Sequence, residues 1–116
     1  RGFVKEGGPE QAANYPDRGL ILMWPDYAGG GSYGISCLRQ YEGHVLVLVG
    51  EWHDCTFGAY ADGLSPFGQS FSAEFQRAVE QDYELECRHR LPNWPLFLDV
   101  MMVWRRKASS RKGSAA

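Results

Sequence analysis

Two groups of residues in this sequence have side chains suited to chemistry, and each follows directly after an apolar run. The first is Trp24-Pro25-Asp26-Tyr27, which comes after the run 20–23. Tyr27 could stack on a planar amino substrate while Asp26 accepts hydrogen bonds from its amino group, so these two are the candidate catalytic residues. Trp24 and Pro25 are candidate substrate-binding residues beside them. The alternative interpretation is a strand-ending turn in which Tyr27 packs locally.

The second group is Glu51-Trp52-His53-Asp54, which follows the run Val45–Val49. A carboxylate next to an imidazole can transfer protons if a substrate lies near. Glu51 and Trp52 are therefore further candidate substrate-binding residues. Polar residues also occur at strand ends without any chemistry, and this alternative stays open.

Two His/Cys pairs are the only pattern that suggests a metal. His53 is separated by one residue from Cys55, and Cys87 by one residue from His89. Four such ligands could bind zinc, but the usual ligand spacing is two to four residues. On a strand, Cys87 and His89 would share the inward face, which suits a small buried cysteine. We therefore predict no metal site.

The elements that must position these residues alternate between helices and strands. The unbroken Val-Leu-Val-Leu-Val run is typical of a strand buried on both faces. The long stretch 50–69 is predicted to be a functional or partner-facing loop. A short link between the last two strands predicts that they are antiparallel. The predicted elements are a short helix over 7–14, strands over 20–24, 44–49, 83–91 and 96–104, a helix over 32–41 capped by Ser32, and a helix over 71–81 capped by Ser70.

Composition and charge limit the function classes. The chain has 116 residues, enough for one small domain with a modest core. All 14 acidic side chains precede residue 105, whereas five of the 12 basic ones lie at residue 105 or after it. An acidic body with a basic tail is not typical of a general nucleic-acid binder. The tail, 107–116, is predicted to be either a solvated, disordered terminus or an arm that touches RNA or an acidic partner.

Cysteine usage and hydropathy indicate the compartment. Three cysteines in a chain of ordinary composition argue against a disulfide scaffold and favour a reducing environment. The longest apolar run is far short of a membrane span, and we see no signal peptide. We therefore expect an intracellular protein, in the cytoplasm or an organelle interior, with no membrane contact.

The predicted series resembles the second half of class I S-adenosylmethionine-dependent methyltransferases. Trp24-Pro25-Asp26-Tyr27 is similar to the Asp/Asn-Pro-Pro-Tyr motif that ends strand four in amino-group methyltransferases, with Trp24 and Asp26 as departures. The chain is also similar to uncharacterised methyltransferase-like proteins with a Trp-Pro-Pro-Tyr strand end. The matching segments there are Gly7–Glu10, Val49–Glu51 and Leu91–Pro95.

The resemblance implies a three-layer Rossmann-like half-sheet of α/β class. Its strands would be four to seven of the family's sheet, in the order 4-5-7-6, all parallel except the last in the chain. The division would be a short helix and turn over 1–19, the half domain over 20–106, and the tail. The cofactor-binding loop of this family belongs to strands one and two, which the chain does not contain. Alone, it is not expected to bind S-adenosylmethionine, although the complete protein could.

The missing half leaves one edge of the strand over 20–24 open, and an open apolar edge invites pairing. Its cover could be the rest of the polypeptide, a separate subunit or a second copy. We expect a degenerate, non-catalytic module that serves as a structural or interaction subunit. The alternative is the substrate-side half of an active methyltransferase. A standalone ligand-binding domain is disfavoured by the open edge.

Overall fold

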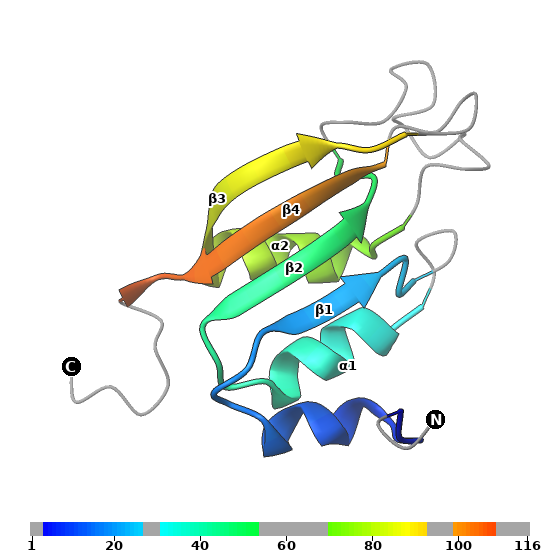
Figure 1. Cartoon of the computed structure of the whole chain (residues 1–116), viewed down its shortest axis with the longest axis vertical. Helices are drawn as coiled ribbons and strands as arrows, with labels where there is room; N and C mark the ends of the chain where they lie inside the picture. Colours follow the sequence, from blue (N-terminus) through cyan, green and yellow to red (C-terminus); the bar gives the residue numbers. More distant parts are fainter. Residues whose placement is uncertain (1–3, 27–30, 54–69, 93–98, 109–116) are drawn as a thin grey trace.

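The computed structural model of the chain describes residues 4–26, 31–53, 70–92 and 99–108. Predicted helices and strands are found in the predicted order, with shifted ends (Figure 1). They are the 3-10 helix η1 (Pro9–Asn14), the helices α1 (Tyr33–Gln40) and α2 (Ala73–Asp82), and the strands β1 (Leu20–Met23), β2 (Val45–Gly50), β3 (Tyr83–Arg90) and β4 (Val100–Arg106).

The predicted short first helix is a 3-10 helix. Two predicted details are wrong. The cap of α2 is Ser72 and not Ser70, because the Ser72 side chain accepts a hydrogen bond from the Phe75 amide. Strand β4 continues to Arg106, two residues beyond its predicted end. Residues 96–98 of that predicted strand lie outside the described residues.

The four strands form one open, mixed sheet in the order β1-β2-β4-β3. Strand β1 is parallel to β2, with Leu20 opposite Leu46, and β4 is antiparallel to both of its neighbours. In the described part of the chain, β1 therefore forms one edge of the sheet and β3 the other. The fold is α/β, as the sequence predicts.

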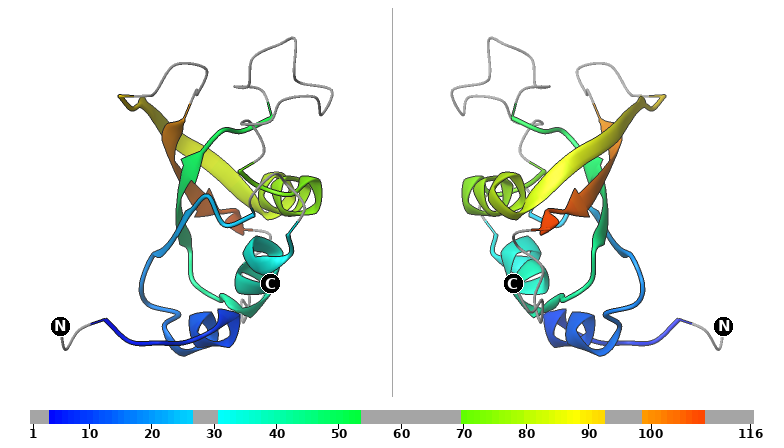
Figure 2. Two further views of the ribbon diagram at one scale, coloured as in Figure 1. Left: turned by 90° about the vertical axis from the view of Figure 1, so that its right-hand side faces the viewer. Right: turned by 90° about the vertical axis from the view of Figure 1, so that its left-hand side faces the viewer.

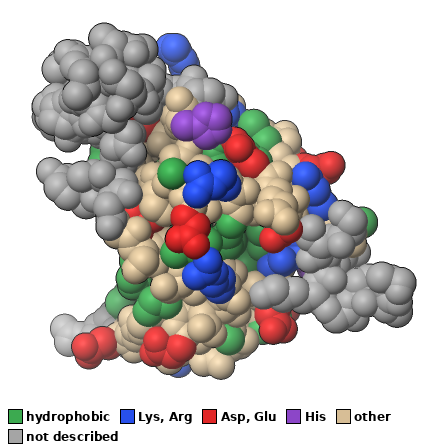
Figure 3. Space-filling model, turned by 180° about the vertical axis from the view of Figure 1, so that it is seen from behind, with side chains coloured by type: hydrophobic (Ala, Val, Ile, Leu, Met, Phe, Trp, Pro, Cys, Tyr) green, Lys and Arg blue, Asp and Glu red, His purple; other side chains and the backbone are tan. Residues whose placement is uncertain are grey.

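Both α-helices lie on the same side of the sheet (Figure 2). Leu46, Leu48 and Met102, from the two central strands, are fully buried in the core beneath them. Charged side chains of both signs cover the outer surface of the helix side (Figure 3). The described residues thus form two layers and not the expected three, because no described helix covers the opposite side of the sheet.

Aromatic rings fill the core where α2 meets the sheet. The ring centroid of Trp52 lies 5.3 Å from that of Phe71 and 5.2 Å from that of Trp104. Phe71 and Phe75 are stacked with centroids 5.4 Å apart. Rings in such geometry gain stabilisation beyond their buried area. The segment after β2 is therefore held against both the sheet and α2.

A β-bulge between Leu85 and Cys87 changes which face the end of β3 presents. Leu85 pairs with Trp104 on the helix side, whereas Cys87 pairs with Val103 on the other side. The predicted inward placement of Cys87 and His89 is therefore wrong, because both lie on the side of the sheet opposite the helices. A bulge inserts an extra residue and reverses the side-chain alternation beyond it.

Arg106 explains why β4 runs past its predicted end. Its side chain is buried, and its Nε and Nη2 atoms donate to the carbonyl oxygens of Gly43 and Tyr41 at 2.7 and 3.0 Å. The guanidinium also lies 4.7 Å from the ring centroid of Tyr83. A charged residue just beyond the predicted end of the strand is thus part of the fold. Among the described residues, no helix has the length and apolar character of a membrane span.

We expect Gly50→Ala to lower the free energy of unfolding by about 2 kcal/mol, because overpacking costs about 1–3 kcal/mol. Gly50 has a φ of 153°, and a Cβ atom there would lie 2.6 Å from the Cβ of Ser70. The control is Gly19→Ala, whose Cβ would meet nothing closer than 3.7 Å. Urea unfolding of both variants measures the difference, and equal stabilities would contradict the prediction.

Candidate functional site

The predicted site residues lie at the edge of the sheet where β1 and β2 end and β4 begins. The Trp24 amide donates to the Val49 carbonyl at 3.0 Å, and the Asp26 amide donates to the Ser70 carbonyl at 3.0 Å. The segments around Asp26 and Glu51 are thereby tied to the residues that precede α2. Tyr27 and Asp54 lie outside the described residues.

Asp26 is a buried carboxylate, 1% exposed, that joins β1 to both α-helices. Its Oδ1 accepts a hydrogen bond from the Gly34 amide at 3.0 Å, and its Oδ2 accepts one from the Ser72 amide at 3.2 Å. Gly34 lies in the first turn of α1, and Ser72 is the N-cap of α2. Amides at helix N-termini favour a negative charge. The geometry gives Asp26 a structural task, and its catalytic role stays a prediction.

Gly34 fits this arrangement because it lacks a side chain. A Cβ atom at this position would lie 2.7 Å from Oδ2 of Asp26 and 3.3 Å from the Pro25 side chain. The first turn of α1 can therefore approach the carboxylate closely only with glycine there. Pro25, a predicted substrate-binding residue, is half-buried at this contact.

Trp24 ends β1 in an unusual backbone conformation. Its φ is 51°, and it is the one described non-glycine residue with a positive φ. Its indole Nε1 donates to Oδ1 of Asp99 at 2.9 Å, which links the end of β1 to the residue before β4. Partial burial raises the pKa of the Asp99 carboxyl, and the Trp24 hydrogen bond opposes this effect. Such strained conformations are found preferentially at functional sites.

Glu51 and Trp52 are buried rather than presented to solvent. Glu51 is 2% exposed, and its amide donates to the Ser70 hydroxyl at 2.9 Å. Trp52 is 1% exposed within the aromatic cluster, so its ring faces are covered in this structure. Their substrate-binding roles stay predictions.

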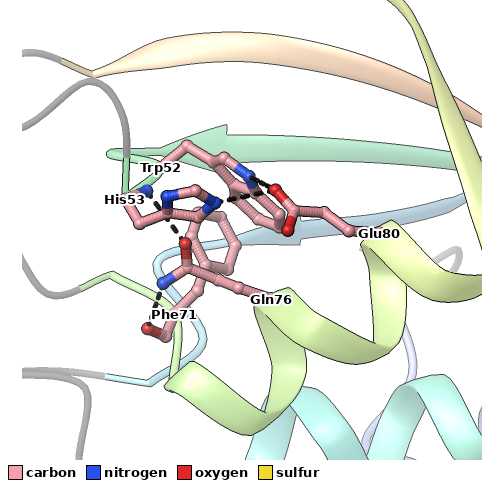
Figure 4. Close-up of polar contacts among 5 residues, drawn as sticks. All are labelled: Trp52, His53, Phe71, Gln76 and Glu80. Atoms are coloured by element: carbon pink, nitrogen blue, oxygen red, sulfur yellow. Dashed lines mark hydrogen bonds and ion pairs between the residues drawn. The ribbon is translucent and has the colours of Figure 1, made fainter.

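The side chain of His53, which follows Trp52, is exposed, and it contacts the Glu80 carboxylate of α2 (Figure 4). Its Nε2 lies 2.7 Å from Oε2 of Glu80, and the same oxygen accepts a hydrogen bond from Trp52 Nε1 at 2.9 Å. The His53 amide donates to Oε1 of Gln76 at 2.9 Å. A carboxylate on one ring nitrogen fixes the orientation of the imidazole. The pair is geometrically suited to proton transfer.

Sequence reasoning missed Glu80 and Gln76, which form this contact with His53. They are four residues apart on α2 and therefore share one face of the helix. That spacing is visible in the sequence, but nothing local indicates that the face lies against the segment after β2. Only the tertiary arrangement shows that the carboxylate beside His53 is that of Glu80 and not that of Glu51, which is closer in the sequence.

His53 is not brought together with Cys87 and His89. Cys87 and His89 pair with Val103 and Met101, on the side of the sheet opposite the helices, whereas His53 contacts α2. Cys55 lies outside the described residues. The described part of the chain contains no group of three or more His, Cys, Asp and Glu side chains placed to hold a metal ion.

Comparison with known proteins identifies no relative: no family model, curated protein or solved structure matches the chain. The resemblance to methyltransferases therefore stays a prediction from the residues quoted for it. The described residues themselves offer a structural carboxylate, a His–Glu pair and a sheet edge at β1 that no described strand covers.

We expect Asp26→Ala to lower the free energy of unfolding by about 3 kcal/mol. The substitution leaves two buried amides without an acceptor, and each such loss costs about 1–3 kcal/mol. The matched control is Glu6→Ala, an exposed carboxylate whose removal should change stability by less than about 0.5 kcal/mol. Chemical unfolding monitored by tryptophan fluorescence checks both values. An Asp26→Ala variant as stable as the control would show that the two hydrogen bonds accepted by Asp26 do not stabilise the fold.

Proposed function

We propose that the chain is a degenerate, non-catalytic methyltransferase-like module that serves as a structural or interaction subunit, completed by a strand from outside the described residues. The observation that carries the proposal is the edge strand β1. Its side chains Ile21 and Met23 are 61% and 65% exposed, although the strand is entirely apolar. Apolar edge strands of this kind are sites of strand addition.

The backbone of β1 is oriented for such an addition. The Trp24 amide donates a hydrogen bond to the Val49 carbonyl of β2. Successive peptide groups of a strand point to opposite sides, so Leu22 and Leu20 also face β2. The N–H and C=O groups of Ile21 and Met23 therefore point to the open edge. In the part of the chain described, no strand pairs with them.

The side of the sheet opposite the helices also favours a partner. Ile21 pairs with Val47, and Val47 pairs in turn with Val103, so apolar side chains run across this side. All-parallel sheets normally have both sides covered, and part of this apolar side belongs to the parallel pair β1–β2. The apolar side continues into the open edge through Ile21 and Met23, so one partner could cover both.

The strand order supports the methyltransferase-like part of the proposal. The sheet order β1-β2-β4-β3, with β4 antiparallel, corresponds to the order 4-5-7-6 that the resemblance implies. We propose that a third layer and S-adenosylmethionine binding, if the complete protein has them, come from the complementing half. The proposed setting is intracellular, with RNA or an acidic surface as a further partner of the basic tail.

One observation favours the alternative, the substrate-side half of an active methyltransferase. The left-handed conformation of Trp24, next to Asp26, is a strained feature at the strand end where the predicted substrate would lie. Calorimetric titration of the full-length encoded protein with S-adenosylmethionine separates the two proposals. Saturable binding would reject the non-catalytic function, and its absence would reject the enzyme.

We expect the isolated chain to self-associate through β1. We expect the double variant Ile21→Lys/Met23→Lys to stay monomeric. Charged side chains, lysine above all, protect edge strands from pairing. Leu85→Lys is the matched control, because Leu85 is an exposed apolar side chain on the opposite edge strand. Light scattering across a concentration series measures the mass. A wild-type chain that stays monomeric at high concentration would count against the proposal.

A further inference from the structure

A large basic hollow lies at the other end of β1, away from the predicted site. Its volume is about 640 Å³, which falls in the range of small-ligand pockets. Two cations, two aromatic rings and two apolar side chains contribute to it. The lining residues are Lys5, Ala12, Tyr15, Arg18, Gly19, Leu20 and Tyr41.

The charge of this hollow is one-sided. Of the described residues that line it, none is acidic, although Glu6 and Asp17 are sequence neighbours of Lys5 and Arg18. Neither Lys5 nor Arg18 forms an ion pair with any described residue. By contrast, Arg39 and Arg105 pair with Glu74 and Glu86. A hollow with two unpaired cations attracts an anionic group.

Arg18 and Tyr15 are held in place by the turn between η1 and β1. The Arg18 amide donates to the Tyr15 carbonyl at 3.2 Å, and the Arg18 guanidinium lies 5.2 Å from the Tyr15 ring centroid. The buried hydroxyl of Tyr41 lies within hydrogen-bond distance of the carbonyls of Arg18 and Val45. The cation and the ring therefore adjoin in a pre-organised turn.

The combination of groups indicates the ligand class. A guanidinium fork binds phosphate oxygens in pairs, and the Lys5 ammonium adds a second positive charge. Tyr15 is 38% exposed and its ring offers a surface for a flat ring, while Ala12 and Leu20 add apolar contact. We propose that this hollow binds a small phosphorylated aromatic molecule, with the chemistry of a nucleoside monophosphate.

The test is a titration of the isotope-labelled full chain with adenosine monophosphate, monitored by NMR. We expect saturable shifts at Tyr15, Arg18 and Leu20, with weaker binding of adenosine and of inorganic phosphate alone. Arg18→Gln should weaken binding about tenfold, which corresponds to the loss of about 1.4 kcal/mol. Tyr15→Leu should reduce the affinity for the nucleotide to that for phosphate.

Arg105→Gln is the matched control, because Arg105 is exposed, is paired with Glu86 and is not among the residues that line the hollow. Lys5, Tyr15 and Arg18 are exposed, so their variants should fold, and unchanged spectra elsewhere verify this. Absence of saturable shifts, or an equal loss in Arg18→Gln and Arg105→Gln, would overturn the site. Equal affinity for phosphate and nucleotide would overturn the aromatic ligand class.

Discussion

One buried carboxylate fixes the relation between the sheet and both α-helices. Asp26 follows the first strand, and its two oxygens bind the amides of Gly34 and Ser72 at the starts of two helices that are 38 residues apart in sequence. The helix starts need an acceptor, and the buried charge needs donors, so each satisfies the other. Because α2 is placed by this contact, the position of Glu80 beside His53 also depends on it.

The sequence predicts much of the fold because the strands and helices carry strong local patterns. The apolar run of β2 and the spacing on α2 indicate their elements directly. The bulge at Leu85 and Cys87 leaves no such pattern, since alternation continues through it in the sequence. The extension of β4 to Arg106 could not be predicted, because a charged residue normally lies in solvent. Its burial depends on contacts with the Gly43 and Tyr41 carbonyls and the Tyr83 ring, which are distant in the sequence.

The candidate site is less predictable than the fold. The residue types predict that Asp26, Glu51 and His53 share one edge of the sheet, and these three residues do lie there. Their exposure could not be predicted, because it depends on segments distant in sequence: Asp26 and Glu51 are buried by the residues before α2, and His53 alone stays exposed. The basic hollow could not be predicted, because its cations, Lys5 and Arg18, are separated in the sequence and form no motif.

The two edges of the sheet differ in a way that limits assembly. Strand β3 presents the charged side chains Glu84, Glu86, Arg88 and Arg90, and its bulge twists the strand. Charges and bulges are the features by which proteins block an edge against pairing. Strand β1 has neither. Among the described strands, only the β1 edge is open to a further strand. The proposed complementing strand would therefore end the assembly as a closed pair and would not begin a fibre.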